Sequence, residues 1–193
     1  MLSLTQIDAL AELLRAGHIA QARELSASLG EPQLRLPGAN LRKATLAGAD
    51  LSRCMLEGAD LSGASLQGCR LLEANLRGAD LTNARVNGAC LILADLSGAN
   101  LTHTQADDAD LYRASLQGAC LISASLRDAA LIRADLRGAD LRQIEWRGSW
   151  IAENQLPGAR LDRAALVAML QAQRTSLVGI SVRDAQLDGL VLD

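Results

Sequence analysis

The chain of 193 residues contains no phenylalanine, one tyrosine and two tryptophans. So few rings suit a narrow core that has no room for large side chains. Charge is nearly balanced, with 19 basic and 22 acidic residues and a net charge of −3, which predicts no strong attraction to nucleic acid or to a membrane surface. No apolar stretch approaches the length needed to cross a bilayer, so we expect no membrane insertion.

Motifs that carry chemistry are also missing. The four cysteines show no metal-ligand spacing such as CxxC, and the two histidines have no nearby partners for a catalytic triad: Cys54, Cys69, Cys90, Cys120, His18 and His103. The glycines between residues 36 and 161 are tied to the repeat, and no phosphate-binding glycine loop is found. We therefore expect no enzyme, no metal and no cofactor. Free thiols and the absence of a signal-peptide pattern predict a cytoplasmic location.

A word of five residues repeats from residue 36 to residue 161. Leucine recurs at every fifth position, giving 26 positions in unbroken phase, and a small residue, usually Ala, lies two positions before each. Four positions depart from Leu: Val86, Ala106, Trp146 and Ile151. A period of five fits neither a helix nor a flat strand, whose side chains repeat at about 3.6 and 2 residues. It predicts an all-β solenoid in which each word forms one side of a coil.

These words resemble those of the pentapeptide-repeat family, whose pattern is A(D/N)LXX, as at residues 59–61 and 99–101. The resemblance covers about two thirds of the chain. It implies a right-handed quadrilateral β-helix with four words per coil. We expect this β-helix to span residues 34–161 within one structural domain.

Glycine and the acidic or amide side chains predict how the coil turns. Glycine follows the central Leu by two residues in two columns of words: Gly58, Gly78, Gly98, Gly118, Gly138 and Gly158, and Gly48, Gly68, Gly88 and Gly148. Because glycine tolerates positive φ, we expect left-handed turns at two opposite corners and not at the other two. An Asp or Asn directly before many Leu is expected to hydrogen-bond to the backbone at the corners.

Residues 1–30 are expected to form a helical hairpin that caps the solenoid, although a partner-binding helical module is an alternative. Ser3 and Gln6 form a capping-box pattern, Gly17 is a candidate helix stop, and the first apolar face comprises Leu4, Ile7, Leu10, Leu13 and Leu14.

At the other end, residues 162–193 predict a helix that interrupts the solenoid, followed by most of one last coil. There the period of five resumes one residue out of phase at Leu177, Val182, Leu187 and Leu192. Since the Trp146 ring replaces a Leu, we expect the coils of the solenoid to become less regular from Ile144 onward.

One side of the predicted coil carries a row of apolar residues directly after the central Leu: Leu72, Ile92, Tyr112 and Ile132. Leu93 lies beside this row and Trp150 lies near its end. Soluble proteins rarely leave such a patch bare without a use. We interpret these six residues as a protein-interaction surface; the alternatives are incidental β-propensity or a terminal segment that covers the row.

The function we favour is a non-enzymatic binding or scaffold rod that presents this row to a protein partner or to a second copy. Some members of the family resemble B-form DNA and protect DNA gyrase, which is the alternative function. Those members are typically strongly acidic, often carry Phe at the central position and dimerise through a C-terminal helix. The lack of Phe and the many Arg among the Asp of this chain argue against that alternative.

Overall fold

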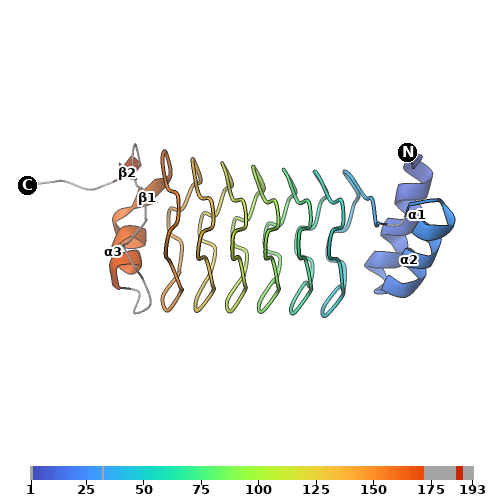
Figure 1. The fold of residues 1–193 in the computed structure, drawn as a ribbon, viewed down its shortest axis with the longest axis horizontal. Coiled ribbons are helices and arrows are strands. Elements are labelled where there is room, and N and C mark those ends of the chain that lie inside the picture. Colours follow the sequence, from blue (N-terminus) through green and yellow to red (C-terminus); the bar gives the residue numbers. More distant parts are fainter. Residues whose placement is uncertain (1, 32, 172–185, 189–193) are drawn as a thin grey trace, which may run out of the picture.

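The computed structural model describes residues 2–31, 33–171 and 186–188, and it forms an elongated rod (Figure 1). The elements follow in the order α1 (Leu4–Arg15), α2 (Ile19–Ser28), β1 (Arg160–Asp162), α3 (Arg163–Gln171) and β2 (Gln186–Asp188). Between α2 and β1 the chain winds as stacked coils. Helices α1 and α2 lie at one end of this stack and α3 lies at the other (Figure 1).

Residues that are twenty apart pair in parallel along the whole stack. The bridges run from Arg35–Met55 to Asp140–Arg160 and involve one residue in each word of five. Each bridge consists of two hydrogen bonds, as where Leu36 N donates to Met55 O at 2.7 Å and Met55 N donates to Leu34 O at 2.9 Å. Four words therefore complete one coil, as the resemblance implied, but the sides are single bridges rather than continuous strands.

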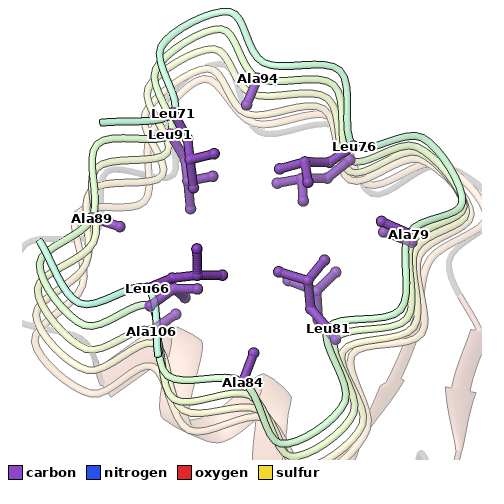
Figure 2. Packing of buried hydrophobic residues seen from close by; sticks show 14 of the residues in the cluster. Leu66, Leu71, Leu76, Ala79, Leu81, Ala84, Ala89, Leu91, Ala94 and Ala106 are labelled. Atoms are coloured by element: carbon purple, nitrogen blue, oxygen red, sulfur yellow. The ribbon is translucent and has the colours of Figure 1, made fainter. Parts of the chain in front are cut away.

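The core is a stack of leucines and alanines. Figure 2 looks along the rod and shows Leu66, Leu71, Leu76 and Leu81 pointing inward from four positions around one coil. The central residues and the small residues two positions before them are almost all fully buried. Because identical positions stack at the spacing of adjacent strands, about 4.8 Å, each Leu packs on its copies above and below.

Polar residues also occupy some of the inward Ala positions. Thr104, Ser149 and Asn154 are fully buried, and each side chain donates to a carbonyl in the coil before it. The Thr104 hydroxyl, for example, lies 2.8 Å from Leu81 O. A buried hydroxyl is tolerated here because its hydrogen bond offsets the cost of leaving water.

All four corners of the coil are left-handed turns, so our expectation that only two corners would be so was wrong. Besides the glycines, non-glycine residues two positions after the central residue have φ of 54–61°, among them Lys43, Leu93, Asp108 and Arg113. The corners close by the same bond at every word up to Leu156 but the one at Ile151, as where Ala44 N donates to Leu41 O at 3.1 Å. That turn requires positive φ at its third residue whatever the side chain, and glycine merely lowers its cost.

The corner role of Asp and Asn is confirmed. Each of the ten expected side chains accepts a hydrogen bond from the backbone N–H two residues later, at 2.9–3.3 Å: Asn40, Asp50, Asp60, Asn75, Asp80, Asp95, Asn100, Asp110, Asp135 and Asp140. This N–H does not take part in the bonding between coils. The carboxylate or amide oxygen therefore accepts from a backbone N–H that has no partner in the hydrogen bonds between coils.

Helix α1 begins at the predicted capping box. Ser3 Oγ accepts from Gln6 N at 3.3 Å, and Gln6 Oε1 accepts from Ser3 N at 2.8 Å. Gly17 follows the helix with φ 78°. The apolar face is narrower than expected because Leu4 is 81% exposed, whereas Ile7, Leu10 and Leu14 are buried in the same cluster as the solenoid core.

The Trp146 ring is fully buried, and its Nε1 donates to Ala165 O of α3 at 3.0 Å. The bridges continue to Arg160, but the expected loss of regularity from Ile144 onward is partly borne out, because the Ile144 N–Leu141 O and Gln155 N–Ala134 O hydrogen bonds lengthen to 3.4 Å. At the Glu153 corner the chain still bends, but Asn154 N does not donate to Ile151 O, which is the hydrogen bond that closes the other corners. The ring is accommodated because the chain leaves the solenoid for α3 one coil later, so no further Leu has to stack on it.

Strand β2 rejoins the stack by pairing in parallel with β1. Leu187 lies opposite Leu161, which is 26 residues earlier rather than 20. The segment that contains α3 therefore enlarges this coil and moves the repeat out of phase by one residue. Leu177, Val182 and Leu192, which we expected in the same last coil, lie outside the described residues.

Candidate interaction surface

The predicted apolar row lies on the outside of the rod. Backbone hydrogen bonds join its members in register, as where Leu93 N donates to Tyr112 O at 3.0 Å and Arg113 N donates to Ile132 O at 3.1 Å. We call Leu72, Ile92, Tyr112 and Ile132 the apolar stripe. All four are half-buried, so part of each side chain meets solvent.

Two larger apolar side chains lie beside the stripe. Leu93 occupies a left-handed corner and is 47% exposed, and Trp150 is 44% exposed. Trp150 belongs to the column of residues that directly precede the central Leu, which pairs through Arg70, Cys90 and Asp110. The structure thus brings the six predicted residues to one side of the rod.

The corner residues next to the stripe are mostly charged and carry both signs. We call Arg53, Glu73, Leu93, Arg113, Arg133 and Glu153 the corner column. Arg53 Nε lies 3.0 Å from Glu73 Oε2, and Arg133 Nε lies 2.7 Å from Glu153 Oε2. The hydrogen bond from Arg133 to Glu153 raises the pKa of Arg133. The Arg113 guanidinium lies 5.3 Å from the centre of the Tyr112 ring, within range of a cation–π contact.

The second side of the coil differs because its outward groups are already used. The hydroxyl in each of three successive words of this side donates to the Asp or Asn two residues before it. The pairs are Ser62–Asp60, Thr82–Asp80 and Thr102–Asn100. This side therefore presents mainly polar groups, and Ile122 is the apolar exception in its column. The contrast with the apolar stripe singles out the stripe side as the surface suited to burial in an interface.

The cysteines are free in the structure and lie apart. Burial raises the pKa of the Cys54 thiol to about 12 and that of Cys69 to about 11, so neither is a nucleophile at neutral pH. Cys90 and Cys120 are half-buried in different columns of bridges, on different sides of the coil.

Within residues 2–31, 33–171 and 186–188 no group of three or more His, Cys, Asp or Glu is arranged to hold a metal ion. A shallow hollow at one glycine corner is lined by Gln117, Gly118, Arg137 and Gly138. In the same part of the chain, no helix is long and apolar enough to span a membrane.

Sequence reasoning located the stripe but missed the charge pattern beside it. The ion pairs join residues that are twenty apart, so they become visible once the four-word coil is established and the corner column is written out. The exposure of Leu93 follows from its corner position two residues after the central Leu91, whereas a Leu at the central position is buried.

Comparison with known proteins identifies the five-residue words as pentapeptide repeats. A family model described as pentapeptide repeats matches eight copies over residues 33–63, 59–98 and 89–128. Among solved structures, HetL from the cyanobacterium Nostoc, a pentapeptide-repeat protein involved in heterocyst differentiation regulation, is 33% identical, with 80% of this chain and 73% of HetL covered and a TM-score of 0.45.

Two further structures are more distant. A pentapeptide-repeat protein of the Arabidopsis thaliana thylakoid lumen is 27% identical over 61% of this chain and 70% of its own, with a TM-score of 0.28. QnrB1, a plasmid-mediated fluoroquinolone resistance protein, is 17% identical over 80% of this chain and 82% of its own, with a TM-score of 0.34. No curated protein matches the sequence.

Proposed function

The chain belongs to the pentapeptide-repeat family, whose members fold as right-handed quadrilateral β-helices, and we propose that it is a non-enzymatic scaffold that binds protein through its apolar stripe. One observation carries the proposal. Four half-buried apolar side chains and the exposed Leu93 and Trp150 share one side of a rod whose second side is polar.

The rigidity of the rod supports a docking role. Every word is bonded to the coils before and after it, and the core is continuous from α1 to α3. A surface on such a scaffold loses little conformational freedom when a partner binds, so more of the apolar burial remains as affinity. Aromatic and aliphatic anchors with charges around them are typical of binding surfaces.

Within this proposal the terminal helices protect the ends of the stack. Leu10 and Leu14 of α1 join the core cluster at the first coil, and the Arg23 guanidinium of α2 donates to Asp50 O. An uncovered end would expose leucines and unpaired backbone groups, which invite end-to-end association. We therefore assign residues 1–30 a capping role, as part of one structural unit with the solenoid at residues 34–161 and the C-terminal segment at 162–193.

The test compares binding by three forms of the full chain. In the stripe variant Leu72, Ile92, Tyr112 and Ile132 are changed to Lys. In a matched control the same change is made at Ser62, Thr82, Thr102 and Ile122, which occupy the same position of the word on the second side. Circular dichroism and a thermal melt establish that each variant folds.

Chemical cross-linking in a native extract, followed by mass spectrometry, then compares the partners of the three forms. We expect the stripe variant to lose protein partners, including copies of itself, that the wild type and the control retain. Equal partners for all three forms would refute the stripe as the binding surface. Loss of the β signal in the stripe variant alone would mean that these side chains support the core.

Gyrase protection by DNA mimicry is the weaker candidate. A DNA mimic needs an unbroken acidic surface, whereas Asp side chains here are neutralised by Arg from neighbouring coils, as in Arg42–Asp60 at 3.4 Å and Arg77–Asp95 at 3.3 Å. We expect the purified protein to leave gyrase supercoiling unchanged, with and without a quinolone. Protection in that assay would reverse the order of the two candidates.

A further inference from the structure

We propose that the partner of the apolar stripe is a second copy of this chain, with the two rods side by side, parallel and in register. The inference rests on the proposed function, since it names the occupant of the same surface. The observation behind it is the charge order of the two columns that flank the stripe. One is the corner column, and the other is the bridge column, which we define as the residues directly before the central Leu of this side: Asp50, Arg70, Cys90, Asp110, Ala130 and Trp150.

A twofold axis that runs along the rods, in front of the stripe, produces this arrangement. The rotation keeps each coil level with the same coil of the second copy, as in an isologous interface. Every residue of the stripe then meets its own copy across the axis, so that Leu72 lies on Leu72 and Ile132 lies on Ile132. Because both rods have the same coil spacing, this match holds over the whole length of the stripe.

The same rotation sets the corner column of one rod against the bridge column of the other. All three charged residues of the bridge column then meet a corner residue of opposite sign, and symmetry forms each pair twice. Between these pairs Leu93 meets Cys90, which continues the apolar contact. Complementary charges of this kind set the register of an interface as well as adding affinity. With the corner residue first, the pairs are Arg53–Asp50, Glu73–Arg70 and Arg113–Asp110.

The charges within each rod are already placed for these pairs. Arg53 Nε lies 3.0 Å from Glu73 Oε2, and Asp50 is bridged to Arg70 in the next coil. In the dimer these four positions, two from each copy, form a square in which the sign of the charge alternates. The Asp50 side chain is 54% exposed although Arg23 lies 4.0 Å from it, so its carboxylate is open to a second cation.

The last two corner residues meet the apolar end of the bridge column. Arg133 faces Ala130 of the second copy and Glu153 faces its Trp150. Within its own rod, however, Arg133 Nε lies 2.7 Å from Glu153 Oε2. The two charges therefore compensate each other when water leaves, and neither is buried without a partner.

A shift of the parallel rods by one coil is less complementary. Arg53 would then face Arg70 on one flank, and Glu73 would face Asp50 on the other. Two contacts between like charges would form, and a single pair of opposite sign would be gained. Like charges that face each other in an interface are costly, so the rods are held in register.

Antiparallel rods would set each column against its own copy in reverse order. The register that keeps the whole stripe together would pair charges in the corner column alone. The charged residues of the bridge column would then face apolar or thiol side chains and lose their water without gaining a partner, which is costly. These contacts would be Asp50–Trp150, Arg70–Ala130 and Asp110–Cys90.

The size of the surface predicts a weak, reversible dimer. The columns from Ser52 to Ala152 cross five coil spacings, roughly 24 Å at about 4.8 Å each. An interface this short lies at the small end of those that proteins use, so we expect a dissociation constant in the micromolar range. Because the charged columns lie at the rim, added salt should weaken the dimer.

Sedimentation velocity over a range of concentrations tests self-association of the full chain. We expect the wild type to dimerise and Ile92→Lys to be monomeric, because the rotation would bring two buried cations together at the axis. Thr82→Lys, the matched change on the second side, should dimerise like the wild type.

A charge swap tests the pairing across the flanks. Asp110→Lys sets two cations against each other and should weaken the dimer by roughly tenfold, because an exposed pair contributes modestly and symmetry repeats the change. Adding Arg113→Glu restores opposite signs, and we expect it to recover most of the lost affinity. Asp80→Lys removes the same corner bond on the second side and should leave the dimer unchanged. A dimer that the swap does not rescue would refute this pairing.

Disulfide cross-linking tests the parallel register. In a chain with Cys90→Ala and Cys120→Ala, the two remaining thiols are fully buried. Leu72→Cys or Ile132→Cys is then added, and copper phenanthroline oxidises pairs of thiols that meet across the axis. We expect each variant to form a covalent dimer by itself, because each position lies opposite its own copy. A covalent dimer that forms only when the two variants are mixed would show antiparallel rods and refute the inference.

A wild type that stays monomeric at every concentration would overturn the inference. The proposed function would still stand if the stripe variant lost a different protein that the second-side control retained. A dimer that Ile92→Lys leaves intact would place self-association elsewhere on the rod and refute the inference.

Discussion

Ala106 is the one described central position of the repeats that carries Ala, and replacing it with Leu should stabilise the protein. Its side chain is 2% exposed and lies in the same corner of the core as Leu66 (Figure 2). The backbone has not moved inward to compensate. Ala106 N donates to Ser125 O at 2.7 Å and Val86 N donates to Gln105 O at 2.7 Å, as at other central positions.

The magnitude follows from the missing atoms. Leu exceeds Ala by three carbons, and each buried methylene is worth about 0.8 kcal/mol, so filling the position should add about 2 kcal/mol to the free energy of unfolding. The reverse change in the same column, Leu66→Ala, removes the same carbons and leaves a cavity, which should cost about 3 kcal/mol.

Urea unfolding followed by circular dichroism measures both variants against the wild type, at a concentration where association is absent. Ala106→Leu should raise the midpoint with an unchanged slope, and Leu66→Ala should lower it. If Ala106→Leu instead destabilised the protein by about 1 kcal/mol or more, the extra methylenes would be overpacking a coil already closed around Ala106, and the reasoning would fail.

Two further predictions concern the acidic corner residues. Asp80→Asn should change the free energy of unfolding by less than about 0.5 kcal/mol, because Asn makes the same bond elsewhere, whereas Asp80→Ala should cost about 1 kcal/mol in the same urea assay. Equal costs for the two would mean that the corner bond contributes nothing. Hydrogen bonds from Arg142 hold the pKa of Asp140 below its usual value, so the folded state resists protonation more than the unfolded state. The resulting stability is present at neutral pH and is lost as the pH falls below about 4; melts from about pH 6 to about pH 2 should show this loss reduced in Asp140→Asn, and an unchanged acid slope would refute the assignment.

The position of the candidate surface could be predicted because the repeat is one-dimensional. Once four words make a coil, every residue has a fixed column, and Leu72, Ile92, Tyr112 and Ile132 fall in one line. The ion pairs Arg53–Glu73 and Arg133–Glu153 follow the same rule in space, but the rotamers that bring the two groups within 3.0 Å do not follow from spacing. The ion pairs beside the stripe therefore needed the structure.

The sequence by itself determined the period, the identity of the core and the ten corner bonds. Each of these depends on one word of five residues repeated in phase, so local chemistry is enough. The tertiary structure decided where that chemistry is overridden. Leu93 adopts the left-handed conformation because the hydrogen bond from Ala94 N to Leu91 O closes its corner, and Leu4 stays exposed at the start of α1 although its periodicity placed it on the apolar face. Trp146 fits within the core because α3 replaces the word that would otherwise lie over it, and a contact between residues nineteen apart, through Ala165, holds it there.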